Sequence, residues 1–374
     1  MGRRGGGGDA VTSPWDRLVG QDHAVALLQR AVDRPVHAYL LVGPRGSGVE
    51  DAARVFAACL VAGEGDDRAV DLALRGMHPD VVEFEPEGVS YRVKEDVRQG
   101  IIPEALRSPV EGARKVIVVH EADRLSANRA VAANALLKTI EEPPDRTVMV
   151  LVTAAADDLP ETVRSRCQRI DLDPLSSATV EAALIADGVA PDAARLAATL
   201  AGGQLGRARS LAGPGRELRA AFVAAARSLD GHAGTAIGAA ESLTERIDAS
   251  LAALKDAHGE AAEAFAAELA AAGYPDRSAS ALRNRLAERH KREQTAAKRR
   301  ALAEGITALE SCYRDALAGP DAPARNLDGT GPIVGPTEAV PAIDACRAAR
   351  ASLGRNPNPA LCLEALLVAL PAAR

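Results

Sequence analysis

The sequence predicts an α/β domain with a parallel sheet, followed by a long region made only of helices. Two observations predict this fold class. Up to Leu172, short apolar segments rich in β-branched residues alternate with segments of helical periodicity, which is typical of parallel strands covered by helices on both faces. After Pro174 the sequence becomes rich in alanine and keeps the helical pattern.

The composition limits the classes of protein that need to be considered. The chain has 374 residues, enough for two or three domains, and is 47% hydrophobic but only 2% aromatic. We therefore expect a helix-rich protein whose cores consist of small aliphatic side chains. The net charge of −6 gives no overall basic field that would attract nucleic acid or a membrane. No apolar run reaches the roughly 18 residues of a membrane-spanning helix.

The first residues, Met1 to Gly8, are basic but have no apolar segment behind them, so they do not form a secretory signal. We expect residues 1–16 to be a disordered tail and the protein to be cytoplasmic. The five cysteines are scattered, odd in number and without metal-ligand spacing, which indicates reduced thiols.

The predicted strands are apolar runs, and the predicted helices lie between them. We expect strands at 37–42, 81–84, 115–119, 147–152 and 168–172, and helices at 22–32, 51–60, 92–107 and 130–140. Segment 63–67 is expected to be a turn or loop.

Beyond residue 175 the helical pattern is interrupted by glycine. We expect breaks between helices at Gly188, at Gly202-Gly203 and at residues 213–215, and then a long helical region to about Leu317. Residues 319–337 are rich in proline and glycine and form either an ordered loop or a flexible connection. The last helices are expected between 337 and 370.

A glycine-rich loop follows the first predicted strand and precedes a helix. Its glycines are Gly43, Gly46 and Gly48, and the pattern Gly-x-x-x-x-Gly between a strand and a helix is that of a phosphate-binding loop. Such a loop continues with lysine, which reaches the phosphates, and then with a hydroxyl residue that binds magnesium. Here those two positions hold Val49 and Glu50.

The carboxylate of Glu50 would repel a bound nucleotide. Two like charges about 4 Å apart repel by roughly 4 kcal/mol at an effective dielectric constant of about 20. That energy corresponds to roughly a thousandfold weaker binding, which Arg45 would offset in part. We therefore predict a nucleotide-binding fold that does not itself use nucleotide, and we expect no cofactor.

His120 and Glu121 follow the predicted strand 115–119, where a second nucleotide motif would be. Such motifs end the strand with Asp-Glu, so that one carboxylate holds magnesium and the other activates water. Glu121 is present, but His120 replaces the aspartate. The alternative is a strand end with ordinary polar residues.

Two arginines are candidate phosphate contacts. Arg166, in Ser165-Arg166-Cys167, precedes the last predicted strand, where an arginine can reach a γ-phosphate bound by a neighbouring subunit. Its alternative role is that of a surface arginine. Arg207 opens a later helix and in an active nucleotide switch would sense phosphate, but without the lysine it is expected to serve a domain interface. The basic residues of 283–300 either contact nucleic acid or form a solvated helix face; Glu288 and Glu293 and the lack of aromatic residues favour the solvated face.

Together these motifs resemble the delta-prime subunits of bacterial DNA polymerase III, in the AAA+ clamp-loader family. The matching segments are Val19-Gly20-Gln21, His37-Ala38-Tyr39-Leu40, Gly43-Pro44, His78-Pro79-Asp80, Asn134-Ala135-Leu136-Leu137-Lys138, Glu141-Glu142-Pro143-Pro144, Ser165-Arg166-Cys167 and 356–366. The match is dense over 17–212 and thin over 230–350. The missing lysine points to delta-prime rather than to the catalytic gamma/tau subunits.

The resemblance implies a domain plan and a role. It implies an AAA+ RecA-like domain at 17–174, a helical lid domain at 175–213 and a helical collar domain at 214–374 that holds a ring of subunits. It further implies gamma/tau and delta subunits as partners, the sliding clamp and primed DNA reached through the complex, no membrane, and Arg166 as an arginine finger acting on the neighbouring gamma/tau site. Polymerase activity would reside in other subunits.

One departure concerns metal. Many members of the family insert four cysteines as a zinc module before the His-Pro-Asp turn, but Cys59 is the only cysteine before Cys167. Four thiolates therefore cannot assemble there, and no zinc is expected.

Two other functions remain open at this stage. The first is an ATP-hydrolysing gamma/tau-like subunit, which a lysine at position 49 would have favoured. The second is a DNA-binding module on the same fold, against which the net acidity and the lack of interleaved aromatic residues argue.

Overall fold

The structure, a computed structural model, describes residues 13–373 except 45, 63–65, 87, 89, 128–129, 320–332 and 354–357. The chain divides into two compact units. The first contains the chain up to Glu85 together with Arg92–Leu175, and the second contains Pro86–Tyr91 and the chain from Ser176 onward. Each unit is described here by itself.

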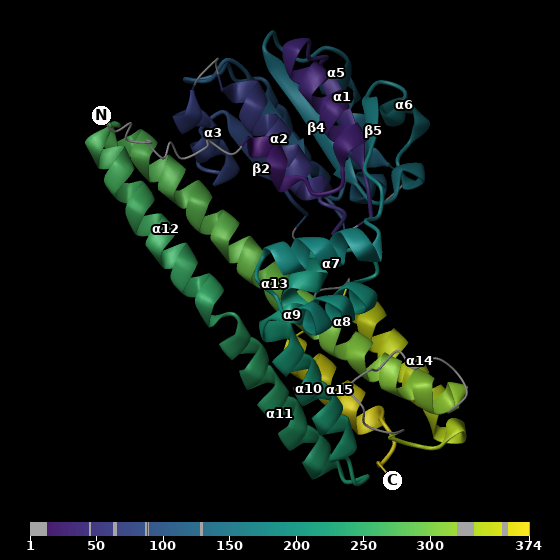
Figure 1. The fold of residues 1–374 in the computed structure, drawn as a ribbon. Coiled ribbons are helices and arrows are strands. Elements are labelled where there is room, and N and C mark those ends of the chain that lie inside the picture. Colours follow the sequence, from purple (N-terminus) through teal and green to yellow (C-terminus); the bar gives the residue numbers. More distant parts are fainter. Residues whose placement is uncertain are drawn as a thin grey trace, which may run out of the picture. The chain divides into compact units, whose positions relative to one another are not determined.

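The first unit contains a five-stranded parallel sheet in the order β2-β3-β4-β1-β5 (Figure 1). Its strands are β1 (Ala38–Val42), β2 (Val81–Phe84), β3 (Lys115–Val119), β4 (Thr147–Thr153) and β5 (Gln168–Asp171). Every residue of β3 and β4 is buried, as expected for inner strands with both faces covered. In the register, Leu40 of β1 lies opposite Leu151 of β4 and Arg169 of β5. The predicted strands are therefore confirmed within one or two residues.

Helices cover both faces of this sheet. They are α1 (Asp22–Asp33), α2 (Val49–Val61), α3 (Asp67–Leu74), the π-helix η2 (Val93–Ile101), α4 (Ile102–Ala105), α5 (Val131–Glu141) and α6 (Glu161–Arg164), with short 3-10 turns at Pro14–Arg17, Ala122–Ser126 and Ala156–Asp158. The ring of Tyr39 on β1 packs edge-on against Phe56 on α2, with ring centroids 4.8 Å apart. These two rings join the first strand to the helix that follows the glycine-rich loop.

Three expectations for this unit need correction. The helix expected at 92–107 consists of the π-helix η2 followed by α4 and ends at Ala105, with Pro103 in the first turn of α4. Helix α3 was not predicted; the side chain of Asp66 caps it by accepting from the backbone N–H of Ala69 at 2.9 Å. The predicted disordered tail 1–16 lies mostly outside the described residues, but its end is ordered, because Trp15 packs against the core.

The second unit is made of helices, as predicted. They are α7 (Ser177–Ala186), α8 (Pro191–Ala201), α9 (Leu205–Ala212), α10 (Pro214–Arg227), α11 (Ala233–Ser250), α12 (Ala252–Ala271), α13 (Asp276–Ala318), α14 (Pro336–Ser352) and α15 (Pro359–Ala369). The expected breaks at Gly188, Gly202-Gly203 and Gly213 are confirmed. With the parallel sheet of the first unit, this confirms the predicted fold class.

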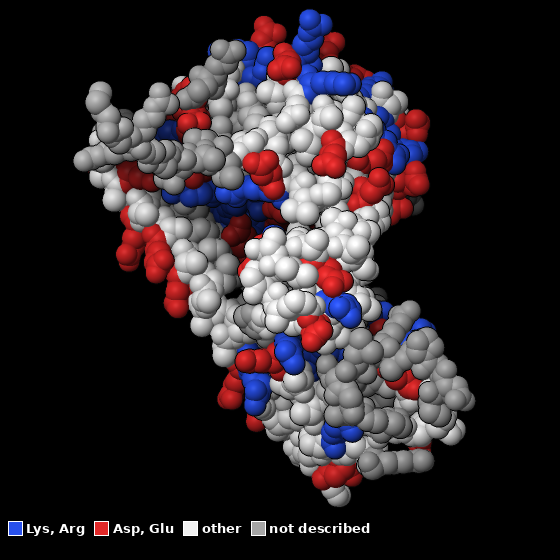
Figure 2. All heavy atoms as spheres, viewed as in Figure 1, with Lys and Arg blue, Asp and Glu red and all other residues white. Residues whose placement is uncertain are grey.

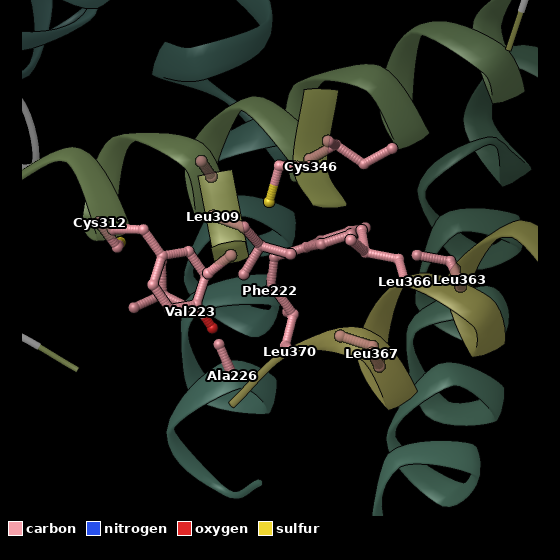
Figure 3. Close-up of a cluster of buried hydrophobic side chains, with 14 of the residues drawn as sticks. Phe222, Val223, Ala226, Leu309, Cys312, Cys346, Leu363, Leu366, Leu367 and Leu370 are labelled. Atoms are coloured by element: carbon pink, nitrogen blue, oxygen red, sulfur yellow. The ribbon is translucent and has the colours of Figure 1, made fainter. Parts of the chain in front are cut away.

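The core of the second unit forms around Phe222 of α10, whose side chain is fully buried (Figure 3). Gly305 of α13 lies directly against this ring: a Cβ atom built on Gly305 would lie only 2.2 Å from Phe222 Cζ. The close approach of the two helices therefore requires glycine at this point. Leu363, Leu366 and Leu367 of α15 contribute to the same core.

Three predictions for the second unit are not confirmed in full. The sequence predicts that Leu361 and Leu363 pack at a subunit or domain interface; Leu363 is buried in the core, whereas Leu361 lies on the opposite face of α15 and is 61% exposed, so its role at an interface stays a prediction. Most of the proline- and glycine-rich segment 319–337 lies outside the described residues, although Ile333 and Val334 are buried in the core. The division into a lid domain (175–213) and a collar domain (214–374) stays a prediction, since the chain from Ser176 onward forms one compact unit.

The basic stretch 283–300 lies on α13, and several of its side chains have acidic partners within the second unit. Lys298 Nζ lies 2.7 Å from Asp248 Oδ1, and Arg289 Nε lies 2.8 Å from Glu293 Oε1. On the neighbouring α12, exposed acidic residues form a row (Figure 2). No helix among the described residues is both long and apolar enough to cross a membrane.

Candidate functional site

The glycine-rich loop has the backbone of a phosphate-binding loop. Gly46 (φ 79°) and Gly48 (φ 92°) are left-handed, a conformation that favours glycine, and Gly48 caps the N-terminus of α2. The N–H of Gly43 donates to the carbonyl of Thr153 on β4 at 3.1 Å. The predicted order of strand, loop and helix is therefore present, the arrangement in which the first turn of a helix can offer its N–H groups to an anion.

The side chains of the loop do not supply phosphate chemistry. Val49, at the position of the phosphate-binding lysine, is 2% exposed and packs in the core of the first unit. Glu50 is half-buried in the first turn of α2, where the helix dipole favours a carboxylate. The hydroxyl of Ser47 is buried with no hydrogen-bond partner among the described residues, and it lies 2.6 Å from where a Cβ on Gly43 would be.

Gln21 holds the loop in place, a role that sequence reasoning missed. Its Nε2 donates to the carbonyl of Ser47 at 3.0 Å and to that of Asp173 at 2.8 Å. The side chain is 5% exposed. Gln21 therefore connects the loop to the chain that leaves β5. The motif Val19-Gly20-Gln21 was the only sequence signal of this contact.

At the end of β3, His120 is engaged by a carboxylate. Its Nε2 lies 2.8 Å from Glu83 Oε2 on the adjacent strand β2, and Arg54 Nε of α2 lies 3.2 Å from the same oxygen. Glu121 has a left-handed backbone (φ 47°) and pairs with Arg124 at 2.5 Å. In place of two carboxylates facing a metal, the described residues form ion pairs with one another.

Thr153 is a second polar residue at this edge of the sheet that the sequence did not reveal. It ends β4, and its hydroxyl donates to Asp123 Oδ1 at 2.6 Å and accepts from the N–H of Ala155 at 3.0 Å. The carboxyl ends of β1, β3 and β4 lie at the same edge of a parallel sheet, so the loop, His120 and Thr153 belong to one region.

Asp80, from the His-Pro-Asp segment, holds the chain that leads into β3. Its carboxylate accepts the N–H groups of Val110, Glu111 and Gly112 at 2.7–2.9 Å, and Lys115 Nζ lies 3.7 Å away. Burial by itself would raise the pKa of Asp80, but the three N–H groups and Lys115 hold that pKa below its usual value. Burial also lowers the pKa of His78, against the opposing effect of Asp80. This cluster has a structural role.

Arg166 lies in the turn between α6 and β5. Its Nε donates to Glu141 Oε1 at the end of α5, and its Nη1 donates to the carbonyl of Thr162 at 2.8 Å. Its side chain is 38% exposed. Arg164 ends α6 and has different partners, Asp157 at 2.8 Å and Glu161 at 2.7 Å. The chain is helical here, so the two arginines do not share a face.

Arg207 lies in the second unit, whereas the residues of the glycine-rich loop lie in the first. Its Nε donates to Glu304 Oε2 of α13 at 2.8 Å, which links α9 to α13. This contact lies inside the second unit, and the role of Arg207 at a domain interface stays a prediction. Its role toward phosphate stays a prediction.

The described residues contain no group of three or more His, Cys, Asp or Glu side chains that could hold a metal ion. The five cysteines are free thiols. Burial raises the pKa of Cys59 to about 11 and that of Cys167 to about 12, so both are protonated at neutral pH. The expectation that the protein carries no zinc stays a prediction.

Comparison with known proteins supports the resemblance. Residues 20–176 match the family described as "DNA polymerase III, delta subunit". The delta-prime subunit of Bacillus subtilis is 34% identical over 188 residues, 48% of this chain and 56% of that protein. The delta-prime subunit of Pseudomonas aeruginosa is 35% identical over 204 residues, 52% of this chain and 61% of that protein.

Related subunits also match. The tau subunit of B. subtilis is 33% identical over 175 residues, 44% of this chain and 30% of that protein. A gamma-subunit-related protein of Thermotoga maritima aligns with 91% of this chain and 96% of its own, at 18% identity and a TM-score of 0.45. The chain spans somewhat more than half the length of the delta-prime relatives it matches. Residues 20–176 are thus similar to delta-prime subunits of bacterial DNA polymerase III and, at a slightly lower identity, to tau and gamma subunits.

Proposed function

We propose that the chain is a non-hydrolysing, delta-prime-like subunit of a clamp-loader complex. It would act in the cytoplasm with gamma/tau and delta subunits, help to load the sliding clamp on primed DNA, and supply Arg166 to the ATP site of a neighbouring subunit. The matches to subunits named delta-prime, gamma and tau support membership in such a complex.

The burial of Val49 carries the non-hydrolysing part of the proposal. An apolar side chain that is 2% exposed in the core offers no charge to a phosphate, and no lysine stands in its place. The neighbouring His120 is paired with Glu83 at 2.8 Å and so is not arranged as a magnesium ligand. Lysine and metal are the two charges that an ATPase of this kind uses, so we expect no hydrolysis by the chain alone.

The position of Arg166 supports its proposed role as an arginine finger. Its side chain is exposed enough to meet a partner, and it lies on a short turn before an edge strand of the sheet. A guanidinium suits phosphate oxygens because its planar fork offers several N–H donors in fixed directions.

The second candidate is an ATP-hydrolysing gamma/tau-like subunit. The 33% identity to the B. subtilis tau subunit favours it, because this value is close to the identities with delta-prime subunits. The residues of the loop favour the first candidate. The two functions differ in what the isolated chain does with ATP.

The experiment has two parts. Purified chain, free of gamma/tau, is assayed for ATP hydrolysis, and the same chain is mixed with gamma/tau and delta subunits and tested for assembly and for clamp loading. The proposal expects background hydrolysis in the first assay and activity that depends on the chain in the second. Turnover by the isolated chain would instead favour the gamma/tau-like function, and failure to join the complex would contradict both.

A further inference from the structure

Arg166 is held at two of the three nitrogens of its guanidinium. Nε donates to Glu141 and Nη1 to the carbonyl of Thr162, four residues earlier, while Nη1 also lies 3.5 Å from the Ser165 hydroxyl. Among the residues that the structure describes, Nη2 donates no hydrogen bond. The contacts thus fix the direction of the side chain and leave its outer nitrogen available.

Arg164 provides the contrast, because both of its terminal nitrogens are used. Nη1 contacts Asp157 and Nη2 contacts Glu161, so this side chain links α6 to the 3-10 turn before it. Arg164 and Arg166 are only two residues apart but pair with different acidic residues. For Arg166 that residue is Glu141, which lies 25 positions away in the sequence.

Glu141 has no evident benefit for its own helix. It is the last residue of α5, whose C-terminus carries the negative end of the helix dipole, so a carboxylate there is unfavourable. Its side chain is 42% exposed, so it does not fill a core. Its contact in the structure is the Nε of Arg166.

We infer that Glu141 is the positioning residue of the Arg166 finger, an inference that rests on the proposed function. The carboxylate binds Nε and the Thr162 carbonyl binds Nη1, so together they direct the outer end of the guanidinium toward the γ-phosphate of a nucleotide on the neighbouring subunit. Glu141 itself does not touch the nucleotide. Its contribution is to reduce the number of directions that the finger samples before it acts.

The expected effect of removing Glu141 is moderate. Exposed ion pairs change a free energy by only about 0.2–1 kcal/mol, which corresponds to about a 1.4- to 5-fold change in rate at the site that Arg166 serves. Because the interaction acts on the orientation of the finger, kcat should fall while the KM for ATP stays unchanged.

The test uses the complex reconstituted with gamma/tau and delta subunits. Glu141→Ala is compared with Glu142→Ala, a matched control that removes the neighbouring exposed carboxylate at the same helix end. Arg166→Ala and the double variant Glu141→Ala/Arg166→Ala complete a cycle. DNA-stimulated ATP hydrolysis is measured for each complex, and thermal unfolding is measured for each isolated chain.

We expect kcat to fall in Glu141→Ala and not in Glu142→Ala, a larger loss in Arg166→Ala, and a double variant equal to Arg166→Ala. An unchanged or faster Glu141→Ala complex, with Arg166→Ala impaired, would overturn the positioning role and leave the finger intact. A double variant clearly worse than Arg166→Ala, or a lower melting temperature in Glu141→Ala, would assign Glu141 a structural role instead. No loss in Arg166→Ala would overturn the finger itself, and the inference with it.

Discussion

His120 Nε2 lies 2.8 Å from Glu83 Oε2, and Arg54 on α2 approaches the same carboxylate at 3.2 Å. The strand end that would hold a metal ion in an ATPase is thus occupied by an ion-paired cluster of protein side chains. Restoring the loop alone would leave this cluster in place. The first prediction follows from it.

We predict that Val49→Lys/Glu50→Thr does not produce ATP hydrolysis. Position 49 is 2% exposed, so the new lysine would bring a charge into the core of the first unit. Because the burial of that charge costs stability, we expect a lower melting temperature. Steady-state hydrolysis by the purified variant checks the first point, and thermal unfolding checks the second. Robust turnover would show that the Glu83–His120 pair does not prevent catalysis.

Arg166→Ala should leave the chain folded and the complex assembled, yet lower DNA-stimulated ATP hydrolysis and clamp loading. Arginine fingers contribute roughly 10³–10⁵ in rate at their own site, and a complex with several sites should show a smaller total loss. Arg166→Lys should rescue only partly, because an ammonium lacks the planar fork.

Arg164→Ala is the control for that prediction, since Arg164 pairs with Asp157 and Glu161 rather than with Glu141. It should have little effect on hydrolysis in the assembled complex. Equal losses from both variants would point to general disruption of the turn before β5.

Gly305→Ala should destabilise the second unit. The added methyl group would lie 2.2 Å from Phe222 Cζ, and overpacking of this kind typically costs about 1–3 kcal/mol. Gly259→Ala is the matched control: this glycine also lies inside a helix, α12, with nothing within 4 Å of an added Cβ. That substitution should stabilise the helix by roughly 0.5–1 kcal/mol. Denaturant unfolding of both variants should show a lower free energy of unfolding for Gly305→Ala and a higher one for Gly259→Ala. An equal change in the free energy of unfolding would contradict the close contact between α10 and α13.

Asp80→Asn should destabilise the first unit near neutral pH, and the difference from the unchanged chain should shrink in acid. The folded state holds the pKa of Asp80 below its value of about 3.9 in the unfolded chain. The carboxylate therefore contributes its stability above the unfolded pKa and loses it as the pH falls through the folded pKa. Unfolding free energies measured between pH 7 and the lowest pH at which both chains stay folded would show this trend. A difference that does not change with pH would contradict it.

Leu363→Ala and Leu361→Ala separate the core of α15 from its surface. Leu363 is fully buried, so its truncation should cost about 2–5 kcal/mol of unfolding free energy. Leu361 is 61% exposed, so its truncation should change stability by less than about 0.5 kcal/mol. If Leu361→Ala instead weakens assembly with gamma/tau and delta subunits while the chain remains folded, α15 contributes its exposed face to a collar.

The strands, the order of the motifs and the residue types at positions 49 and 50 could all be predicted or read from the amino-acid sequence. Runs such as residues 116–119 and 148–152 are apolar throughout and rich in β-branched residues, which is typical of strands buried on both faces of a sheet. The replacement of lysine by Val49 is a change of residue type, visible without any structure. Composition and glycine positions likewise predicted that the second unit is helical, but not where α10, α11, α12 and α13 begin and end.

Which side chains meet became known only from the packing of the helices and strands. Glu83 and His120 come from adjacent strands 37 positions apart, and Glu141 and Arg166 from the end of one helix and a later turn. Local periodicity carries no information about such pairs, because their distance depends on strand order and on how elements pack. The same reason applies to Gly305: glycine is required there because the ring of Phe222, on another helix, leaves no room for a Cβ atom. It applies also to Leu361, because a short apolar helix does not reveal which of its leucines faces the core.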